Sequence, residues 1–178
     1  MIGLKRGVVK LVEHQEFWAE EARNTIAELK GLLGNIAVDI QHIGSTAVPT
    51  IHAKPIIDIV VGVFDLNDVL PAVNQLNKNN FIFRGEDIPG QLLFVKGDNE
   101  NDTRTHHIHI VKWNGIEWNN YVNFRDYLIA FPQKAKSYDD CKQKAAAQYS
   151  EDRKNYTAAK QTLINCYIEE ARLWKAKQ

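Results

Sequence analysis

The chain has 178 residues, of which 44% are hydrophobic and 25% are charged, a composition typical of a globular protein that buries its core without disulfides or structural metals. Its 22 basic and 22 acidic residues cancel, so the sequence lacks the basic excess that nucleic-acid-binding proteins usually carry. No segment approaches the ~20 consecutive apolar residues that span a bilayer. We therefore expect a cytoplasmic protein whose partners include neither nucleic acid nor membrane.

The first part of the chain predicts a helix and two strands. Apolar residues recur at steps of three and four over residues 15–33, which indicates an amphipathic helix that ends at Gly34. Residues 36–43 combine apolar and polar positions as a half-buried strand does. Residues 56–63 are a run rich in Ile and Val that is interrupted by Asp58, and they form the clearest strand of the sequence.

A further helix and three more strands complete the predicted sheet. Residues 67–78 indicate the helix, with Pro71 in its first turn, where no backbone N–H is needed. A polar loop over residues 97–104 precedes the last strand. We expect the sheet to be mixed. The three strands are predicted at residues 81–84, 92–96 and 105–113.

The remainder of the chain has the hydrophobic period of helices. A first helix is stopped by Pro132, because proline cannot continue the hydrogen-bond pattern. A second helix is opened by a Ser137-x-x-Asp140 capping box. A last long helix is started by Ser150. The end of the chain is therefore predicted to be a helical bundle.

These elements predict an α+β fold with a mixed sheet core, an N-terminal helix and a C-terminal helical bundle. The length fits one domain over residues 1–178. Within it we expect an α/β core at residues 1–115 and a helical part at residues 116–178. The oligomeric state does not follow from the sequence.

A Gly-Ser pair at Gly44-Ser45 follows the first strand and is a candidate phosphate-binding turn, because glycine lets backbone amides approach an anion closely. Asp58, in the next strand, is costly to bury unless it is paired or bound to a cation. Metal-assisted phosphoryl or nucleotidyl transfer needs this juxtaposition, since the cation bridges carboxylate and phosphate oxygens. A plain turn and a structural aspartate are the alternative.

Three histidines stand in the last predicted strand. Strand alternation places His107 and His109 on one face and His106 on the other. Two imidazoles at this spacing can bind a metal, donate to phosphate oxygens, or act as acid and base. Structural zinc is poorly supported, since no further Cys, His or carboxylate stands at ligand spacing. Hydrogen-bonded, half-buried histidines are the structural alternative.

Arg125, Lys142 and Lys160 stand on the predicted C-terminal helices. If this part of the chain folds over the sheet, the three become candidates for a clamp on a polyphosphate group. A solvated pair between Arg125 and Asp126 is the commoner fate of such helix charges. The sequence leaves both readings open.

These residues together resemble the GrpB family, a branch of the nucleotidyltransferase superfamily that also occurs fused to dephospho-CoA kinases. The resemblance runs almost end to end. Its most specific block is His42-Ile43-Gly44-Ser45-Thr46-Ala47-Val48-Pro49. Supporting blocks are residues 53–59, residues 107–111, Phe124-Arg125-Asp126-Tyr127-Leu128, and the spacing from Tyr156 to Lys160.

The resemblance implies a nucleotidyltransferase-like α/β core in which the Gly-Ser turn holds a nucleoside triphosphate. It also implies that strand carboxylates hold a divalent metal, here Mg²⁺ or Mn²⁺. In the wider superfamily the strand reads Asp-x-Asp or Asp-x-Glu, whereas this strand reads Asp58-Ile59-Val60. The second metal carboxylate is therefore missing from its usual place, and His107 or His109 is a candidate for the position of the third.

We therefore expect a protein that transfers a nucleotidyl or phosphoryl group from a nucleoside triphosphate to a small acceptor. The alternative is a non-catalytic nucleotide- or coenzyme-binding module. The expected catalytic residues are Asp58, His107 and His109, and Asp58 is also the expected metal ligand. The expected substrate-binding residues are His42, Gly44, Ser45, Thr46, Lys54, Arg104, Arg125, Lys142 and Lys160.

Overall fold

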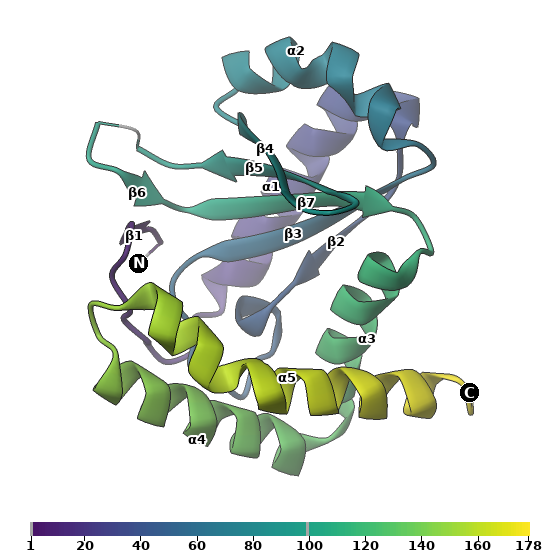
Figure 1. Ribbon diagram of the computed structural model, residues 1–178. Coiled ribbons are helices and arrows are strands. Elements are labelled where there is room, and N and C mark those ends of the chain that lie inside the picture. Colours follow the sequence, from purple (N-terminus) through teal and green to yellow (C-terminus); the bar gives the residue numbers. More distant parts are fainter. Residues whose placement is uncertain (1, 99) are drawn as a thin grey trace.

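A five-stranded sheet lies at the centre of the computed structural model, which describes residues 2–98 and 100–178. Position 99 of the predicted polar loop thus lies outside the described residues. β3 and β7 run parallel and the other neighbouring pairs run antiparallel, which confirms the expected mixed sheet. The strand order is β2 (Ala37–Ile43), β3 (Ile57–Val63), β7 (His106–Lys112), β5 (Gln91–Lys96) and β4 (Ile82–Ile88) (Figure 1).

A second sheet of two strands joins the N-terminal segment to the end of the polar loop. β1 (Leu4–Lys5) pairs antiparallel with β6 (Thr103–Arg104). The sequence predicted neither strand, because two residues are too few to display a period. The pairing places Arg104 beside the start of the chain.

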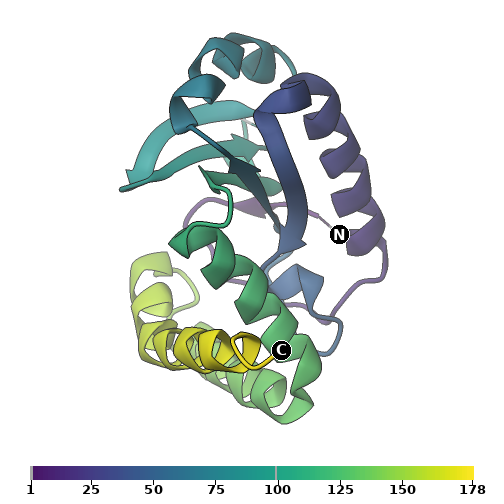
Figure 2. The ribbon, with the colours of Figure 1, turned by 90° about the vertical axis from the view of Figure 1, so that its right-hand side faces the viewer.

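Helix α1 (Phe17–Leu33) covers one face of the sheet, as Figure 2 shows most clearly. The apolar stripe predicted for this helix is its buried side, with Trp18 at 0% and Leu29 at 1% exposure. Gly34 ends the helix as predicted. Across from the stripe, the facing side chains of β3 and β7 complete the main core; they are Ile57, Ile59, Val61, Val63, Ile108 and Ile110.

The opposite face of the sheet carries the candidate functional side chains. Side chains alternate along a strand, so Asp58 in β3 points away from α1. The parallel register pairs Asp58 with His107 in β7, and His109 follows on the same face. His106 points to the other side, where His106 Nε2 lies 3.1 Å from Thr25 Oγ1 of α1. The alternation predicted for the histidines is confirmed.

The C-terminal helices pack together beside the sheet (Figures 1 and 2). They are α3 (Ile116–Ala130), α4 (Pro132–Gln148) and α5 (Arg153–Lys175). Trp118, near the start of α3, packs on the sheet. The bundle core also includes Val48 and Ile51 from the loop after Gly44, so that loop is held between sheet and bundle. None of the helices in the described part is both long and apolar enough to cross a membrane.

The segment predicted as one helix at residues 67–78 consists of two pieces. A 3-10 helix, η3 (Leu66–Ala72), is followed by the short α2 (Val73–Lys78) at the top of Figure 1. Pro71 therefore lies inside the 3-10 helix, and its predicted place in the first turn of an α-helix is wrong. Proline lacks a backbone N–H and crowds the carbonyl four residues earlier, so the α-helical pattern begins only beyond it.

The starts of α4 and α5 also differ from the sequence predictions. α4 begins at Pro132, since a proline fits the first helical turn, and Ser137 consequently lies inside the helix instead of capping it. α5 begins after Asp152, whose carboxylate accepts a hydrogen bond from the backbone N of Asn155 at 3.0 Å. The predicted start at Ser150 is therefore too early.

Candidate functional site

A pocket of about 360 Å³ lies where the sheet face opposite α1 meets the helical bundle. It receives side chains from β3, from β7, from the loop after Gly44 and from all three bundle helices. The predicted site residues that line it are Gly44, Ser45, Thr46, Lys54, Asp58, His107, His109, Lys142 and Lys160. The structure thus brings most of the candidates to one place.

Gly44 and Asp58 meet directly, because β2 and β3 pair antiparallel with Ile43 opposite Asp58. Gly44 has φ 72° and ψ −171°, a conformation that residues with a Cβ rarely adopt. A Cβ atom on Gly44 would lie 2.6 Å from Asp58 Oδ2. The turn therefore requires glycine both for its backbone and for the carboxylate beside it, and the expected juxtaposition of turn and acid is present.

Two histidines of the neighbouring strand hold Asp58. His107 Nδ1 lies 3.1 Å from Asp58 Oδ1 and donates a hydrogen bond to it, whereas His109 Nε2 lies 3.8 Å from that oxygen, beyond hydrogen-bond range. Burial alone would raise the pKa of Asp58, but the contacts with both histidines outweigh it and hold the pKa well below its usual range. The Asp58 side chain keeps 29% exposure. It is an ionised group within reach of a ligand.

The position two residues further along β3 is closed to a second metal ligand. Val60 has 0% exposure and packs with Val111 and Trp118. Among the described residues that line the pocket, Asp58 is the only carboxylate. This donor set does not fit a pair of Mg²⁺ ions, because each ion needs one or two carboxylates besides phosphate oxygens.

Four basic side chains, Lys54, Lys142, Lys160 and Arg153, line the same pocket. Burial, followed by repulsion from Lys54 and Lys142, lowers the pKa of Lys160 to about 7 against the attraction of Asp58. Burial likewise lowers the pKa of Lys142 to about 8. Burial and then the charge of Arg153 lower the pKa of Lys54. The pocket gathers more positive charge than its single carboxylate compensates.

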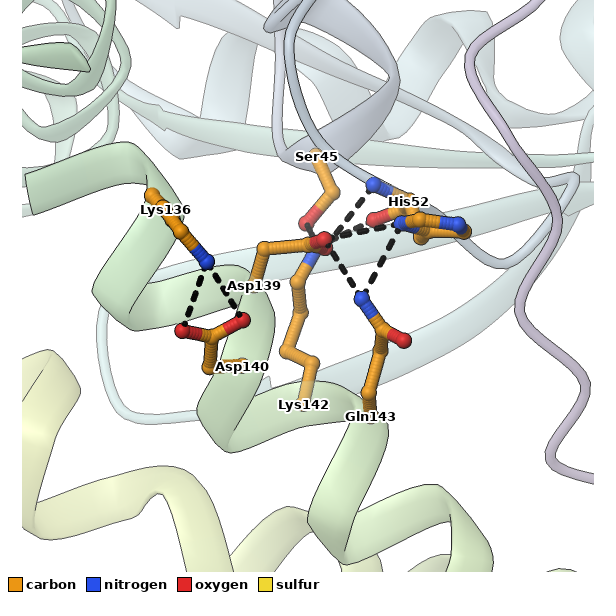
Figure 3. Close-up of polar contacts among 7 residues, drawn as sticks. All are labelled: Ser45, His52, Lys136, Asp139, Asp140, Lys142 and Gln143. Atoms are coloured by element: carbon orange, nitrogen blue, oxygen red, sulfur yellow. Dashed lines mark hydrogen bonds and ion pairs between the residues drawn. The ribbon is translucent and has the colours of Figure 1, made fainter. Parts of the chain in front are cut away.

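Lys142 is fixed by a network that ties α4 to the loop after Gly44 (Figure 3). Its Nζ donates to Ser45 Oγ at 3.2 Å and to the His52 carbonyl, and it lies 3.6 Å from Asp139 Oδ1. Asp139 in turn accepts from the backbone N of His52, from His52 Nδ1 and from Gln143 Nε2, each at 2.8 Å. The network places an ammonium group at the hydroxyl of Ser45.

His42, Arg104 and Arg125 do not line the pocket. His42 Nε2 lies 2.9 Å from Thr46 Oγ1, and burial lowers the pKa of His42 to about 4. Arg125 donates to the His42 carbonyl at 2.8 Å and pairs with Asp126 at 2.6 Å. Arg104 lies 3.6 Å from an aspartate of its own loop. His42 and Arg125 therefore support the Gly44 turn from outside the cavity.

Several lining residues were missed by the sequence reasoning. The sequence patterns do not single out Arg153, Thr157, Tyr121 or Tyr138 as site residues, and Tyr156 enters only through the family block that spans Tyr156 to Lys160. The spacing of Arg153, Tyr156 and Lys160 by three and four residues was the available signal, because it places all three on one side of a helix. The missed lining residues with polar groups are Tyr121, Tyr138, Arg153, Tyr156 and Thr157.

Comparisons with known proteins point to one family. The model of the family described as GrpB protein matches residues 8–170. The glutamate-rich protein GrpB of Alkalihalophilus pseudofirmus is 38% identical over 173 residues, covering 96% of this chain and 99% of that relative. The crystal structure of the conserved protein GrpB from Enterococcus faecalis has a TM-score of 0.86 and 30% identity, covering 95% of this chain and 100% of that chain. A structure of the Cid1 poly(U) polymerase has a TM-score of 0.47 and 13% identity, covering 74% of this chain and 45% of that chain.

Proposed function

The chain belongs to the GrpB family, and we propose that its pocket binds the phosphate groups of a nucleotide or of a similar phosphate-bearing small molecule. The observation that carries the proposal is the convergence of Lys54, Lys142, Lys160 and Arg153 on one cavity. The four come from the loop before β3, from α4 and from α5, so only the folded chain unites them. Asp58 is the one carboxylate among the described lining residues.

The energetics of the lysines support an anionic ligand. Burial lowers the pKa of Lys142, and burial followed by repulsion from Lys54 and Lys142 lowers the pKa of Lys160, so keeping both lysines charged costs free energy. A bound polyphosphate would form charge-assisted hydrogen bonds with these ammonium groups and remove their repulsion. The Ser45 hydroxyl lies 3.2 Å from Lys142 Nζ and would donate a further hydrogen bond to the phosphate.

The dimensions and the remaining walls suit a nucleotide-sized molecule. A cavity of about 360 Å³ is within the usual range for small-molecule sites. The rings of Tyr121, Tyr138 and Tyr156 supply apolar and aromatic surface for a sugar or base. We propose that the lysines bind the phosphates and that the tyrosines contact the sugar or base of the ligand.

Transfer of a nucleotidyl or phosphoryl group to a small acceptor is the second candidate function. It is favoured by one observation: Asp58, His107 and His109 face the same cavity as the lysines. A divalent ion there would polarise a phosphate oxygen. Because the donor set does not fit paired Mg²⁺ ions, phosphate binding remains the function that the geometry supports best.

Titration with adenosine, AMP, pyrophosphate and ATP tests the proposal, first without a metal ion and then with Mg²⁺. We expect adenosine to bind undetectably at about 1 mM and affinity to rise with the number of phosphates, because each adds charge-assisted contacts. Equal binding of adenosine and ATP would contradict a phosphate site. Pyrophosphate release from ATP in the presence of candidate acceptors would add support for the transfer reaction.

Lys160→Met is expected to weaken pyrophosphate binding about 10–100-fold, the effect of losing one or two charge-assisted hydrogen bonds. Without ligand, the same variant should be as stable as the wild type or about 1 kcal/mol more stable, since it removes a repelled ammonium group. Calorimetric titration and thermal unfolding measure the two effects. Lys136→Met is the matched control, because Lys136 pairs with Asp140 outside the pocket. Equal affinities of the two variants would count against the site.

Phosphate binding is also expected to take up protons at about pH 8, near the pKa of Lys142. Lys160 and Lys142 are partly neutral there in the free protein, and a bound anion raises both pKa values, so affinity should fall as the pH rises further. Titration in two buffers of different ionisation enthalpy measures the uptake, and Lys160→Met should reduce it. The charged or titratable groups facing Lys160 include Lys54, Lys142, Asp58, Cys141 and Tyr156, and Asp139 and Tyr138 face Lys142.

A further inference from the structure

We infer that Asp58, His107 and His109 form a three-ligand site for one transition-metal ion, such as Zn²⁺, Mn²⁺ or Co²⁺, in place of paired Mg²⁺ ions. The ion would lie in the same cavity as the phosphate-binding lysines, so the inference deepens the proposed function. The role of the ion in that cavity rests on the proposed function. Binding of the metal itself does not require a phosphate ligand.

The geometry of the three side chains is close to that of a metal site. Their candidate ligand atoms all lie within 4.8 Å of one another. Asp58 Oδ1 lies 3.1 Å from His107 Nδ1 and 3.8 Å from His109 Nε2. Two atoms bound at about 2.1 Å to one ion lie roughly 3–3.5 Å apart, so small side-chain movements suffice. The parallel register of β3 and β7 fixes the three side chains on one sheet face.

His109 supplies a second, independent observation. Its Nδ1 is buried and has no hydrogen-bond partner among the described residues. Its Nε2 faces Asp58 at 3.8 Å, too far for a hydrogen bond. The nitrogen that faces the cavity is therefore Nε2, and an ion between it and the Asp58 carboxylate would bind both. The buried Nδ1 on the other side of the ring gains no partner from that ion.

The chemistry of the donors decides the class of metal. Two imidazoles and one carboxylate suit Zn²⁺, Co²⁺ or Mn²⁺, whereas Mg²⁺ prefers oxygen ligands in octahedral geometry. Three protein ligands leave positions open for water or a phosphate oxygen, as in catalytic metal sites. Because His109 Nδ1 lacks an acceptor, we expect affinity about 10–100-fold below that of a site with a complete second shell.

Cobalt binding to the chelator-treated protein in phosphate-free buffer tests the inference. We expect one Co²⁺ per chain, with absorption bands typical of nitrogen and oxygen ligands, displacement by Zn²⁺, and no displacement by Mg²⁺ in 100-fold excess. Asp58→Asn and His109→Asn should each weaken Co²⁺ binding at least tenfold. His106→Asn is the matched control, since it lies on the same strand with its ring on the α1 side, and it should change affinity less than twofold.

Failure of the wild type to bind Co²⁺ or Zn²⁺, equal competition by Mg²⁺, or unchanged binding by His109→Asn would each overturn the inference. The cobalt spectrum of the wild type keeps the test decisive even if a variant does not fold. Pyrophosphate titration of the metal-free protein is the separate measure of the lysine site. Cobalt binding without pyrophosphate binding would reject only the proposed function, and the reverse result would reject only the metal site.

Discussion

Asp139→Ala is expected to lower the free energy of unfolding by about 3–5 kcal/mol, the effect of removing one partner from a buried ion pair. Lys142 has 1% exposure, and Asp139 is the carboxylate that faces its ammonium group at 3.6 Å. The substitution also leaves the donors of His52 and Gln143 without their acceptor. Urea unfolding followed by circular dichroism at neutral pH measures the loss.

The neighbouring residue on α4 provides the control. Asp140 forms an exposed pair with Lys136 at 3.1 Å, which Figure 3 shows beside the buried network. Asp140→Ala should change stability by no more than about 0.5 kcal/mol, because exposed pairs contribute little. Adding Lys142→Met to Asp139→Ala should restore part of the lost stability by removing the unpaired charge. Equal effects of the two alanine substitutions would mean that the buried network does not stabilise the fold.

The same carboxylate gives a dependence on pH with a definite sign. Burial opposes ionisation of Asp139, but hydrogen bonds from His52 and Gln143 and the charge of Lys142 hold its pKa below the ordinary value of 3.8. A carboxyl whose pKa falls on folding stabilises the protein above its unfolded pKa. The difference between wild type and Asp139→Ala should therefore be full from pH 3.8 to neutral pH, where Lys142 is charged, and shrink as the pH falls below 3.8.

Gly44→Ala is expected to destabilise the protein by about 2–3 kcal/mol and to weaken phosphate and metal binding together. Alanine is strained at φ 72° and ψ −171°, and its Cβ would lie 2.6 Å from Asp58 Oδ2. The Asp58 carboxylate must then move away from the turn. Because the same carboxylate faces His107 and His109, its movement also changes the proposed metal site. Chemical unfolding and the cobalt and pyrophosphate titrations measure these effects.

Two further variants separate the causes of the Gly44 effect. Gly31→Ala is the control, since Gly31 lies in helix α1 with no atom within 4 Å of an added Cβ, and it should stabilise by about 0.5–1 kcal/mol. Combining Gly44→Ala with Asp58→Ala removes the contact with Oδ2 at 2.6 Å but keeps the approach to the Cβ of residue 58 at 3.0 Å and the backbone strain, so stability should recover only in part. Wild-type stability and ligand binding of Gly44→Ala would contradict the role assigned to the turn.

Family membership confirms the resemblance that was read from residues 42–49 and their supporting blocks, because the family model covers residues 8–170. The predicted mixed sheet, the N-terminal helix and the helices after residue 116 are also present. Helix starts were less predictable. Pro132 and Asp152 open α4 and α5, and Ser137 and Ser150 do not, because competing cap residues within a few positions differ little in free energy.

The sequence by itself determined the features that depend on local period and on neighbouring strands. Side-chain alternation set His107 and His109 apart from His106, and the short connection from the Gly44 turn to the next strand favoured the meeting of Gly44 and Asp58. Val60 stands two residues after Asp58, so the sequence alone shows that the second metal carboxylate is missing from its usual place. Each of these follows from geometry that repeats every two residues or from a connection between adjacent elements, so no distant contact is needed.

Only the tertiary structure decided which basic residues meet the turn. Lys142 and Lys160 reach the pocket with the unforeseen Arg153, whereas Arg125 turns to the His42 carbonyl and Arg104 stays in its own loop. Helical period tells which side of a helix a residue occupies but not where that side faces. The direction in which a helix side faces is fixed by packing between segments far apart in sequence. Here Val48 and Ile51 pack into the bundle core. The burial of apolar surface depends on area and shape and not on sequence order.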